Sequence, residues 1–318
     1  MEPAERALFE RGVRHATEAG TGAPLDAALE VLGWRDALDA DRALAVSVLF
    51  ERLGLSGTSS AALDWLLSAA LDGDVGDAVV LPPLQCDGPP ARREGDGFVV
   101  RGVGTAALAN TDRALVAVAD DGDGGSTAFA VETARLGRRP VHGLDPDLGL
   151  VEVTGRFAAS DVAPPVPVDW PAVCMLGQLA LGHELVGAGR AMLELARTHA
   201  LERVQFGRPI ATFQAVRHRL AESLVALEAA TALLDATWED PSPVTAAMAK
   251  AFAGRATRTV SRHCQQVLAG IGFTTEHPLH GFVRRILVLD QLLGGRVLTA
   301  RLGTDIVQRA SLPAAFPL

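Results

Sequence analysis

The feature that most constrains this chain is a double change in the spacing of its apolar residues. Over residues 2–71 apolar side chains recur at helical spacing, as at Leu25 and Leu29. Over residues 77–162 the period falls to two, and from residue 169 onward it is helical again. This order predicts helices, then a small β region, then a long helical bundle, which is an α+β fold.

The period changes also predict three domains, at 1–76, 77–165 and 166–318. Short β-branched segments bounded by turn residues predict a small antiparallel sheet or barrel, with strands at 78–81, 97–103, 114–119, 127–131 and 150–153. Long apolar stripes predict the C-terminal helices at 171–202, 210–238, 244–268, 280–293 and 295–310. The stripes on 210–238 and 244–268 favour these two helices as a subunit interface.

Composition excludes several classes of function. The chain has 318 residues and a net charge of −9, so a broad nucleic-acid-binding surface is not expected. Lys250 is the only lysine, which excludes a Walker-type phosphate loop and any Schiff base at another position. The chain has no tyrosine, so no phenol can act as a general acid.

No metal site or membrane segment is expected. The three cysteines are far apart, and Cys174 and Cys264 lie in apolar helical patterns, which predicts buried small side chains rather than ligands. The first ten residues show no signal peptide, and no run of about 18 apolar residues is found. We therefore expect a cytoplasmic protein that does not cross a membrane.

One motif breaks the helical pattern between residues 202 and 214. Arg203, Gln205 and Phe206 cluster beside Gly207, next to the start of a helix. Arginine can bind phosphate oxygens with paired donors, helix N-termini add N–H groups, and an aromatic side chain can lie against a flat ring. The alternative is an ordinary helix–helix turn with a solvated arginine and a core phenylalanine.

A second motif follows the helix predicted at 244–268. Glycines at 270 and 272 permit close backbone approach, although a simple helix-terminating turn would also explain them. His277 and His280 lie in the same stretch. Two histidines without a third ligand are typical of loops, so they do not predict a metal site.

Together the two motifs resemble the acyl-CoA dehydrogenase family. The match is Arg203-x-x-Phe206-Gly207 followed by Gln214, and then Gln266-x-x-x-Gly270-x-Gly272-Phe273-x-x-Glu276. The resemblance implies an N-terminal helical domain, a small central β-barrel or sheet domain and a C-terminal four-helix bundle. It also implies FAD as cofactor and the α,β-dehydrogenation of an acyl-CoA thioester, possible substrates including a steroid side-chain CoA.

The resemblance further assigns residues to the cofactor. In this family the matching positions contact the ADP part of a flavin that the neighbouring subunit mainly holds, and here they are Arg203, Gln205, Phe206, Phe213, Gln266 and Gly270.

Both positions where the family carries its catalytic glutamate lack a carboxylate in this chain. They hold Leu293 and Gly177. The segments that line the flavin ring also differ, since residues 81–86 lack the family's hydroxyl donors and Leu108 replaces a threonine. The resemblance therefore implies that this chain has no catalytic residue and does not hold a productive flavin of its own.

The retained flavin contacts beside the lost base predict a subunit of a heteromeric enzyme, with FAD shared with a homologous catalytic partner. Such α2β2 assemblies occur in the actinobacterial steroid side-chain branch of the family, so a heterotetramer is expected. Two alternatives remain open. One is a self-sufficient homo-oligomeric enzyme whose base has moved to Glu184 or Glu276. The other is a non-enzymatic binding or scaffold protein on the same fold.

Overall fold

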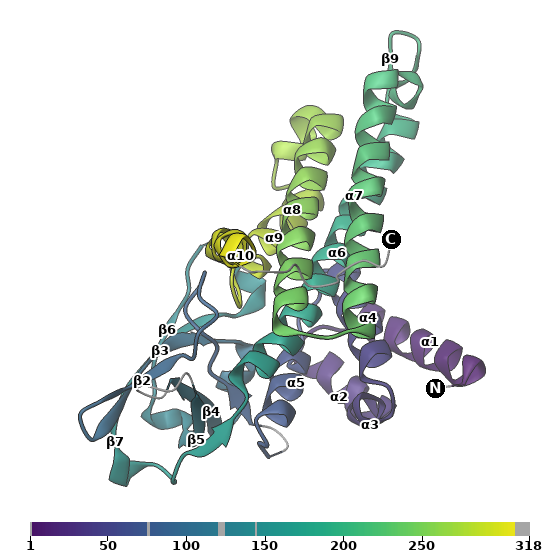
Figure 1. Ribbon diagram of the computed structural model, residues 1–318. Coiled ribbons are helices and arrows are strands. Elements are labelled where there is room, and N and C mark those ends of the chain that lie inside the picture. The colour runs from purple at the N-terminus through teal and green to yellow at the C-terminus, as the bar shows by residue number, and fades with distance from the viewer. Residues whose placement is uncertain (1, 75–76, 120–124, 144, 309–318) are drawn as a thin grey trace.

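The computed structural model describes residues 2–74, 77–119, 125–143 and 145–308. Three long helices within residues 170–268 form a tower that rises above the rest of the molecule (Figure 1). The N-terminal helices lie at the base of this tower, and the β-sheet lies beside them on the other side of its lower end (Figure 1). The sequence-predicted order of helices, strands and helices is confirmed. The domain boundaries at 76/77 and 165/166 stay predictions.

Five helices build the N-terminal region: α1 (Pro3–Ala19), α2 (Ala23–Leu32), α3 (Trp34–Ala40), α4 (Arg42–Ser56) and α5 (Ala62–Ala70). The acidic side chain of Asp41 accepts a hydrogen bond from the backbone N–H of Leu44 and so caps the start of α4. Gly33 has a φ of 74°, which lets the chain turn sharply between α2 and α3.

The β region is a mixed sheet rather than the antiparallel one predicted. Its strands are β1 (Ala78–Val79), β2 (Ala91–Glu94), β3 (Gly97–Gly104), β4 (Arg113–Ala119), β5 (Ser126–Glu132), β6 (Gly137–Pro140), β7 (Val151–Ala158) and β8 (Val166–Val168). They are ordered β6-β7-β3-β2-β4-β5-β8, and β1 and β2 both pair with β4 in parallel. Sequence periodicity missed β2, β6 and β8, because the first two are short and rich in arginine and the third lies among prolines. Residues 120–124, most of the turn expected between the strands predicted at 114–119 and 127–131, lie outside the described residues.

The C-terminal region contains α6 (Trp170–Glu202), α7 (Gln214–Glu239), α8 (Pro243–Leu268), α9 (Leu279–Leu289) and α10 (Arg296–Gln308). A two-stranded hairpin, β9 (Val204–Gln205) and β10 (Arg208–Pro209), joins α6 to α7 at the tip of the tower (Figure 1). Two predicted helix limits are wrong. Residues 210–212 form a 3₁₀ turn, η5, before α7, and α9 ends at Leu289 instead of reaching residue 293.

One apolar core joins the N-terminal helices to α6, α8 and α9, while the sheet encloses a second core of its own. Helix α6 is long and apolar enough to cross a membrane by length and composition alone. However, 89% of its most apolar window is buried inside the fold, so α6 is the central helix of the core. The backbones of α4 and α6 touch, because a Cβ on Gly54 or Gly187 would overlap the backbone of the other helix.

Candidate functional site

The first motif forms the hairpin at the tip of the tower. Phe206 and Gly207 have φ values of 52° and 76°, which is the pattern of a two-residue turn between antiparallel strands. The N–H of Ile210 donates to the carbonyl of Arg203 at 2.8 Å and closes the base of the hairpin. The helix break was predicted, whereas the hairpin was not, because each strand has only two residues.

The side chains of this hairpin point to solvent. The Phe206 ring is 91% exposed, so the core-phenylalanine interpretation is wrong. It meets Phe213 edge to face at 6.0 Å between centroids, and the Arg208 guanidinium lies 4.5 Å from the centroid of the same Phe213 ring. Arg203 and Gln205 are also exposed. The hairpin therefore presents cationic, amide and aromatic groups together on an open surface.

The second motif lies at the same end of the bundle. Helix α8 ends there and continues as the 3₁₀ turn η6 (Ala269–Phe273). Gln266 is exposed, and an added Cβ at Gly270 would meet nothing within 4 Å. Burial lowers the pKa of His199, near the C-terminus of α6, and the neighbouring His277 and Arg203 act in the same direction. The fold thus brings the two motifs, within residues 203–214 and 266–276, to one end of the tower, which we call the tower end. Their contacts with a flavin stay a prediction.

Both expected base positions lie together in the interior. Leu293 is 1% exposed, and a Cβ added to Gly177 would overlap its Cδ1 atom. The backbone at Leu293 has a φ of 51°, and the following Gly294 and Gly295 also have positive φ values. The Gln178 side-chain amide donates to the Leu293 carbonyl at 3.0 Å and holds this turn against α6. Where the resemblance places a carboxylate, the described structure has packed apolar atoms.

The two carboxylates considered as alternative bases, Glu276 and Glu184, lie in different places. Glu276 is exposed in the loop that follows η6, at the tower end. Glu184 is 6% exposed and lies on α6, 15 residues before His199, which corresponds to roughly 22 Å along a helix. The structure therefore does not bring the two carboxylates together.

The environment of Glu184 differs from that of an ordinary surface carboxylate. Burial raises the pKa of Glu184 to about 7, although the neighbouring Arg285 acts in the opposite direction. The carboxylate lies 3.9 Å from Arg285 Nη1 and lines a cavity of about 360 Å³. This is the setting in which a carboxyl group can exchange a proton near neutral pH.

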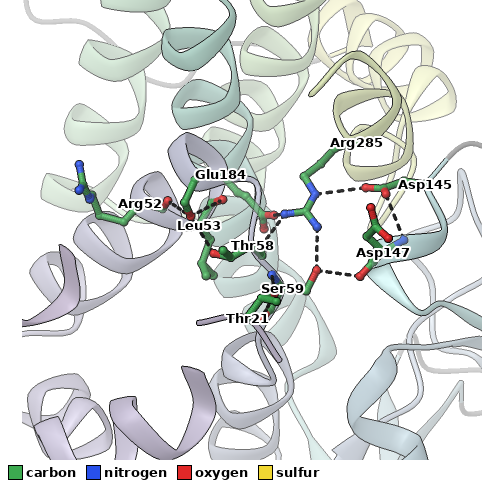
Figure 2. Close-up of polar contacts among 10 residues, drawn as sticks. Thr21, Arg52, Leu53, Thr58, Ser59, Asp145, Asp147, Glu184 and Arg285 are labelled. Atoms are coloured by element: carbon green, nitrogen blue, oxygen red, sulfur yellow. Dashed lines mark hydrogen bonds and ion pairs between the residues drawn. The ribbon is translucent and has the colours of Figure 1, made fainter. Parts of the chain in front are cut away.

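A polar cluster around Arg285 was missed in the sequence. Arg285 is 3% exposed, and its guanidinium donates to Asp145 Oδ2 at 3.2 Å, to the Thr58 carbonyl at 2.5 Å and to Ser59 Oγ at 2.7 Å (Figure 2). Together with Glu184, these groups tie three regions of the chain to α9. The available signal was an arginine directly before Ile286 on the apolar face of a predicted helix.

The β region provides no hydroxyl donor at position 108. Leu108 is 0% exposed and packs in the core of the sheet, beside Gly104. The loop at 82–86 is held to the end of α9, because the Gln85 N–H donates to the Gln291 carbonyl at 2.8 Å.

Cys174 and Cys264 are buried, as predicted. Among the described residues, no group of three or more His, Cys, Asp or Glu side chains is arranged to hold a metal ion.

The distribution of groups allows a test of how a flavin would fit. An ADP moiety needs open donors and close backbone approach, and Arg203, Gln205, Gln266 and Gly270 supply these on an exposed surface. A flavin ring needs polar contacts, and the buried Leu108 cannot provide one. The residues at the tower end therefore fit the outer part of a flavin better than the residues of the β region fit its ring.

Comparison with known proteins places this architecture in a family. Residues 174–304 match the family model described as acyl-CoA dehydrogenase, C-terminal domain. The acyl-CoA dehydrogenase IpdE2 of Mycobacterium tuberculosis is 34% identical over 159 residues, covering 50% of this chain and 48% of that protein. The match thus spans about half the length of this relative.

Two solved structures are similar over nearly the whole chain. The ChsE4–ChsE5 complex from Mycobacterium tuberculosis has a chain with a TM-score of 0.74 and 21% identity, covering 98% of this chain and 99% of that one. A Tcur3481–Tcur3483 steroid acyl-CoA dehydrogenase variant gives a TM-score of 0.73 and 21% identity, with 96% and 98% covered. At these identities the likeness shows the fold. The C-terminal region, residues 174–304, therefore belongs to the acyl-CoA dehydrogenase family by sequence, and nearly the whole chain has the fold of the solved structures that resemble it.

Proposed function

We propose that this chain is the non-catalytic subunit of a heteromeric FAD-dependent acyl-CoA dehydrogenase, and that its tower end completes the FAD site of a homologous catalytic partner. The observation that carries the proposal is the contact between Leu293 and Gly177. Leucine and glycine cannot accept a proton, and the Leu293 side chain fills the space that a side chain at 177 would need. The α-proton of an acyl-CoA has no acceptor at either position.

The exposed surface of the tower end supports the partner. Large apolar side chains on the hairpin and η6 are exposed, namely Val204, Phe206, Ile271 and Phe273. Exposed aromatic groups beside arginines are typical of interfaces and cofactor contacts. The family is FAD-dependent, and two structural neighbours are complexes of two different chains. When bound there, FAD would accept the hydride, while Arg203 would pair with its phosphates and Gly270 would let backbone lie against it.

A steroid side-chain CoA is the substrate class we propose for the partner's site. Its support is that one structural neighbour is a steroid acyl-CoA dehydrogenase variant. We propose a heterotetramer in the cytoplasm as the working assembly, with α7 and α8 at the subunit interface. Exposed Leu224 and Val225 on α7 support this choice of surface.

The experiment compares the chain alone with the chain co-expressed with its neighbouring reading frame. We expect the chain alone to bind no stoichiometric FAD and to oxidise no acyl-CoA, and the complex to contain flavin. In that complex, Arg203→Ala should lower flavin occupancy, measured by absorbance after denaturation. Arg197→Ala, an exposed arginine on α6, is the matched control. Stoichiometric FAD and turnover by the chain alone, or unchanged occupancy in Arg203→Ala, would contradict the proposal.

One observation favours a second candidate, a self-sufficient homo-oligomeric enzyme that uses Glu184 as its base. Glu184 is buried, lines a cavity and has a pKa raised to about 7, whereas Glu276 is exposed. Turnover of an acyl-CoA by the chain alone that is lost in Glu184→Gln would establish this candidate. A flavin-free complex would instead favour a scaffold protein.

A further inference from the structure

A cavity of about 360 Å³ lies where α2, α5, α6 and the turn η1 (Ala106–Ala109) meet. Ala27, Glu30 and Asn110 line it and are exposed, so they mark its solvent side. Leu181 and Glu184 of α6 are buried and form its floor. The volume lies in the range of small-molecule sites, about 300–1,000 Å³.

Most of the cavity wall is apolar. The larger apolar side chains that line it come from five separate segments, and they are Phe50, Leu53, Leu63, Trp65, Leu148, Leu150, Leu181, Leu289 and Leu292. A wall of this kind favours a ligand that is itself mostly apolar, because both surfaces lose contact with water on binding.

Glu184 is the polar group on the floor, and only one long ion pair contacts it. Its carboxylate accepts no hydrogen bond from the described residues, and its one ion pair, to Arg285, is 3.9 Å long. The Arg285 guanidinium is already engaged by other oxygen atoms, as the dashed lines in Figure 2 show. A hydrogen bond to a buried group is typically worth about 0.5–1.5 kcal/mol, so a ligand that supplies one to Glu184 gains affinity.

The other acidic group deep in the wall is already satisfied. Asp26 accepts hydrogen bonds from Ser60 Oγ at 2.6 Å and from the Ala61 N–H at 2.9 Å. An anionic ligand would meet Asp26, Glu30 and Glu184 together, and a cation would have to give up its water in an apolar cavity. An uncharged ligand avoids both penalties.

We propose that this cavity binds a small, uncharged and largely apolar molecule carrying one hydroxyl or carbonyl group, and that Glu184 makes the hydrogen bond to that group. An ionised Glu184 accepts from a hydroxyl, and a protonated Glu184 donates to a carbonyl. This binding site does not depend on flavin contacts at the tower end, since no residue of the tower end lines the cavity.

Calorimetric titration of the full chain with three two-ring probes tests the proposal. Tetralin is the hydrocarbon, 2-tetralol adds one hydroxyl group, and 2-tetralone adds one carbonyl group. We expect 2-tetralol to bind with a Kd about tenfold lower than that of tetralin, as one buried hydrogen bond predicts. In Glu184→Leu this preference should vanish. Glu194→Gln, an exposed glutamate on the same helix, should keep it.

The pH dependence of 2-tetralone binding gives a second readout if Glu184→Leu does not fold. Affinity should fall as the pH rises through about 7 in the wild type, because Glu184 loses the proton that it donates. In Glu184→Gln it should not change with pH. The charged groups that face Glu184 or line the same cavity are Arg285, Asp145, Asp26, Glu30 and Arg35. No saturable binding, equal affinity for tetralin and 2-tetralol, or the same pH profile in Glu184→Gln would overturn the proposal.

Discussion

Gly177 on α6 and Leu293 after α9 occupy one shared space in the protein interior, so that a Cβ on the first would overlap the side chain of the second. The two positions are 116 residues apart in the chain. Both are positions where the resemblance places the catalytic base, and their contact means that a side chain at position 177 would have to displace Leu293. The Leu293 side chain therefore fills the space that the glycine at position 177 leaves open.

This contact predicts coupling between substitutions at the two sites. Gly177→Ala should lower the free energy of unfolding by about 1–3 kcal/mol, because the added methyl group overpacks the site. Leu293→Ala should cost about 2–5 kcal/mol by leaving a cavity. In the double variant the new methyl group enters that cavity, so the combined loss should be smaller than the sum.

Urea unfolding of the two single variants and the double variant measures this coupling. Gly281→Ala is the control, because a Cβ there meets nothing within 4 Å on helix α9. It should leave stability unchanged or raise it by about 0.4–1 kcal/mol. Strictly additive losses for Gly177→Ala and Leu293→Ala would show that the two side chains do not share one space.

Arg285 should be necessary for stability because it neutralises buried carboxylates. Its removal would leave Asp145, whose side chain is 7% exposed, without its ion-pair partner. Breaking a buried pair in this way costs about 3–5 kcal/mol. Arg285→Leu should therefore lower the urea midpoint markedly, and Arg285→Lys should recover only part of the loss, since one ammonium cannot reproduce the three-partner geometry. Arg197→Leu, whose arginine is exposed, should change stability by less than about 0.5 kcal/mol. An Arg285→Leu variant as stable as the wild type would contradict this role.

The sequence predicted those parts of the fold that depend on local pattern. Helices α6 and α8 were found to within one residue, because long apolar stripes and flanking prolines mark them. Strands β3, β4 and β5 were also found from their period of two. Strand β2 escaped, because its four residues include Arg92, Arg93 and Glu94 and only Ala91 is buried.

The site residues also divide into those that a local motif reveals and those that only the folded structure shows. Arg203 and Phe206 were noticed because their motif interrupts a helix, and the structure adds that they are exposed. The pairing of Arg285 with Asp145 joins residues 140 positions apart, and no periodicity reports a contact of that range. The sequence could not show either that the Glu184 carboxylate has only a long ion pair to Arg285, since this depends on where the neighbouring donors point.

Glu184 should make stability fall as pH rises through neutrality. Burial raises its folded pKa from 4.5 to about 7, so between these values the folded state binds a proton that the unfolded state has lost. That stabilisation is complete below about pH 4.5 and is lost as the pH rises through 7. Glu184→Gln lacks the titrating group. Its free energy of unfolding, relative to the wild type, should therefore increase between about pH 5 and pH 8, as measured by urea titration. A difference that stays constant over this range would contradict the assignment.

Lys250 should have the opposite dependence at higher pH. It is 1% exposed, its Nζ donates to the Asp290 carbonyl at 2.9 Å, and burial lowers its pKa from 10.5 to about 8. Between these values the unfolded chain binds a proton that the folded chain has released, so stability should rise with pH by roughly 1 kcal/mol per pH unit at the steepest point. The comparison is with Lys250→Met, which keeps the length of the side chain and cannot titrate. Burial also raises the pKa values of Cys174 and Cys264, but both thiols are present in each protein. The difference in free energy of unfolding between the two proteins therefore reports Lys250 alone. We therefore expect the wild type to gain stability over Lys250→Met between about pH 8 and pH 10, and equal slopes for the two proteins would show that Lys250 keeps an ordinary pKa.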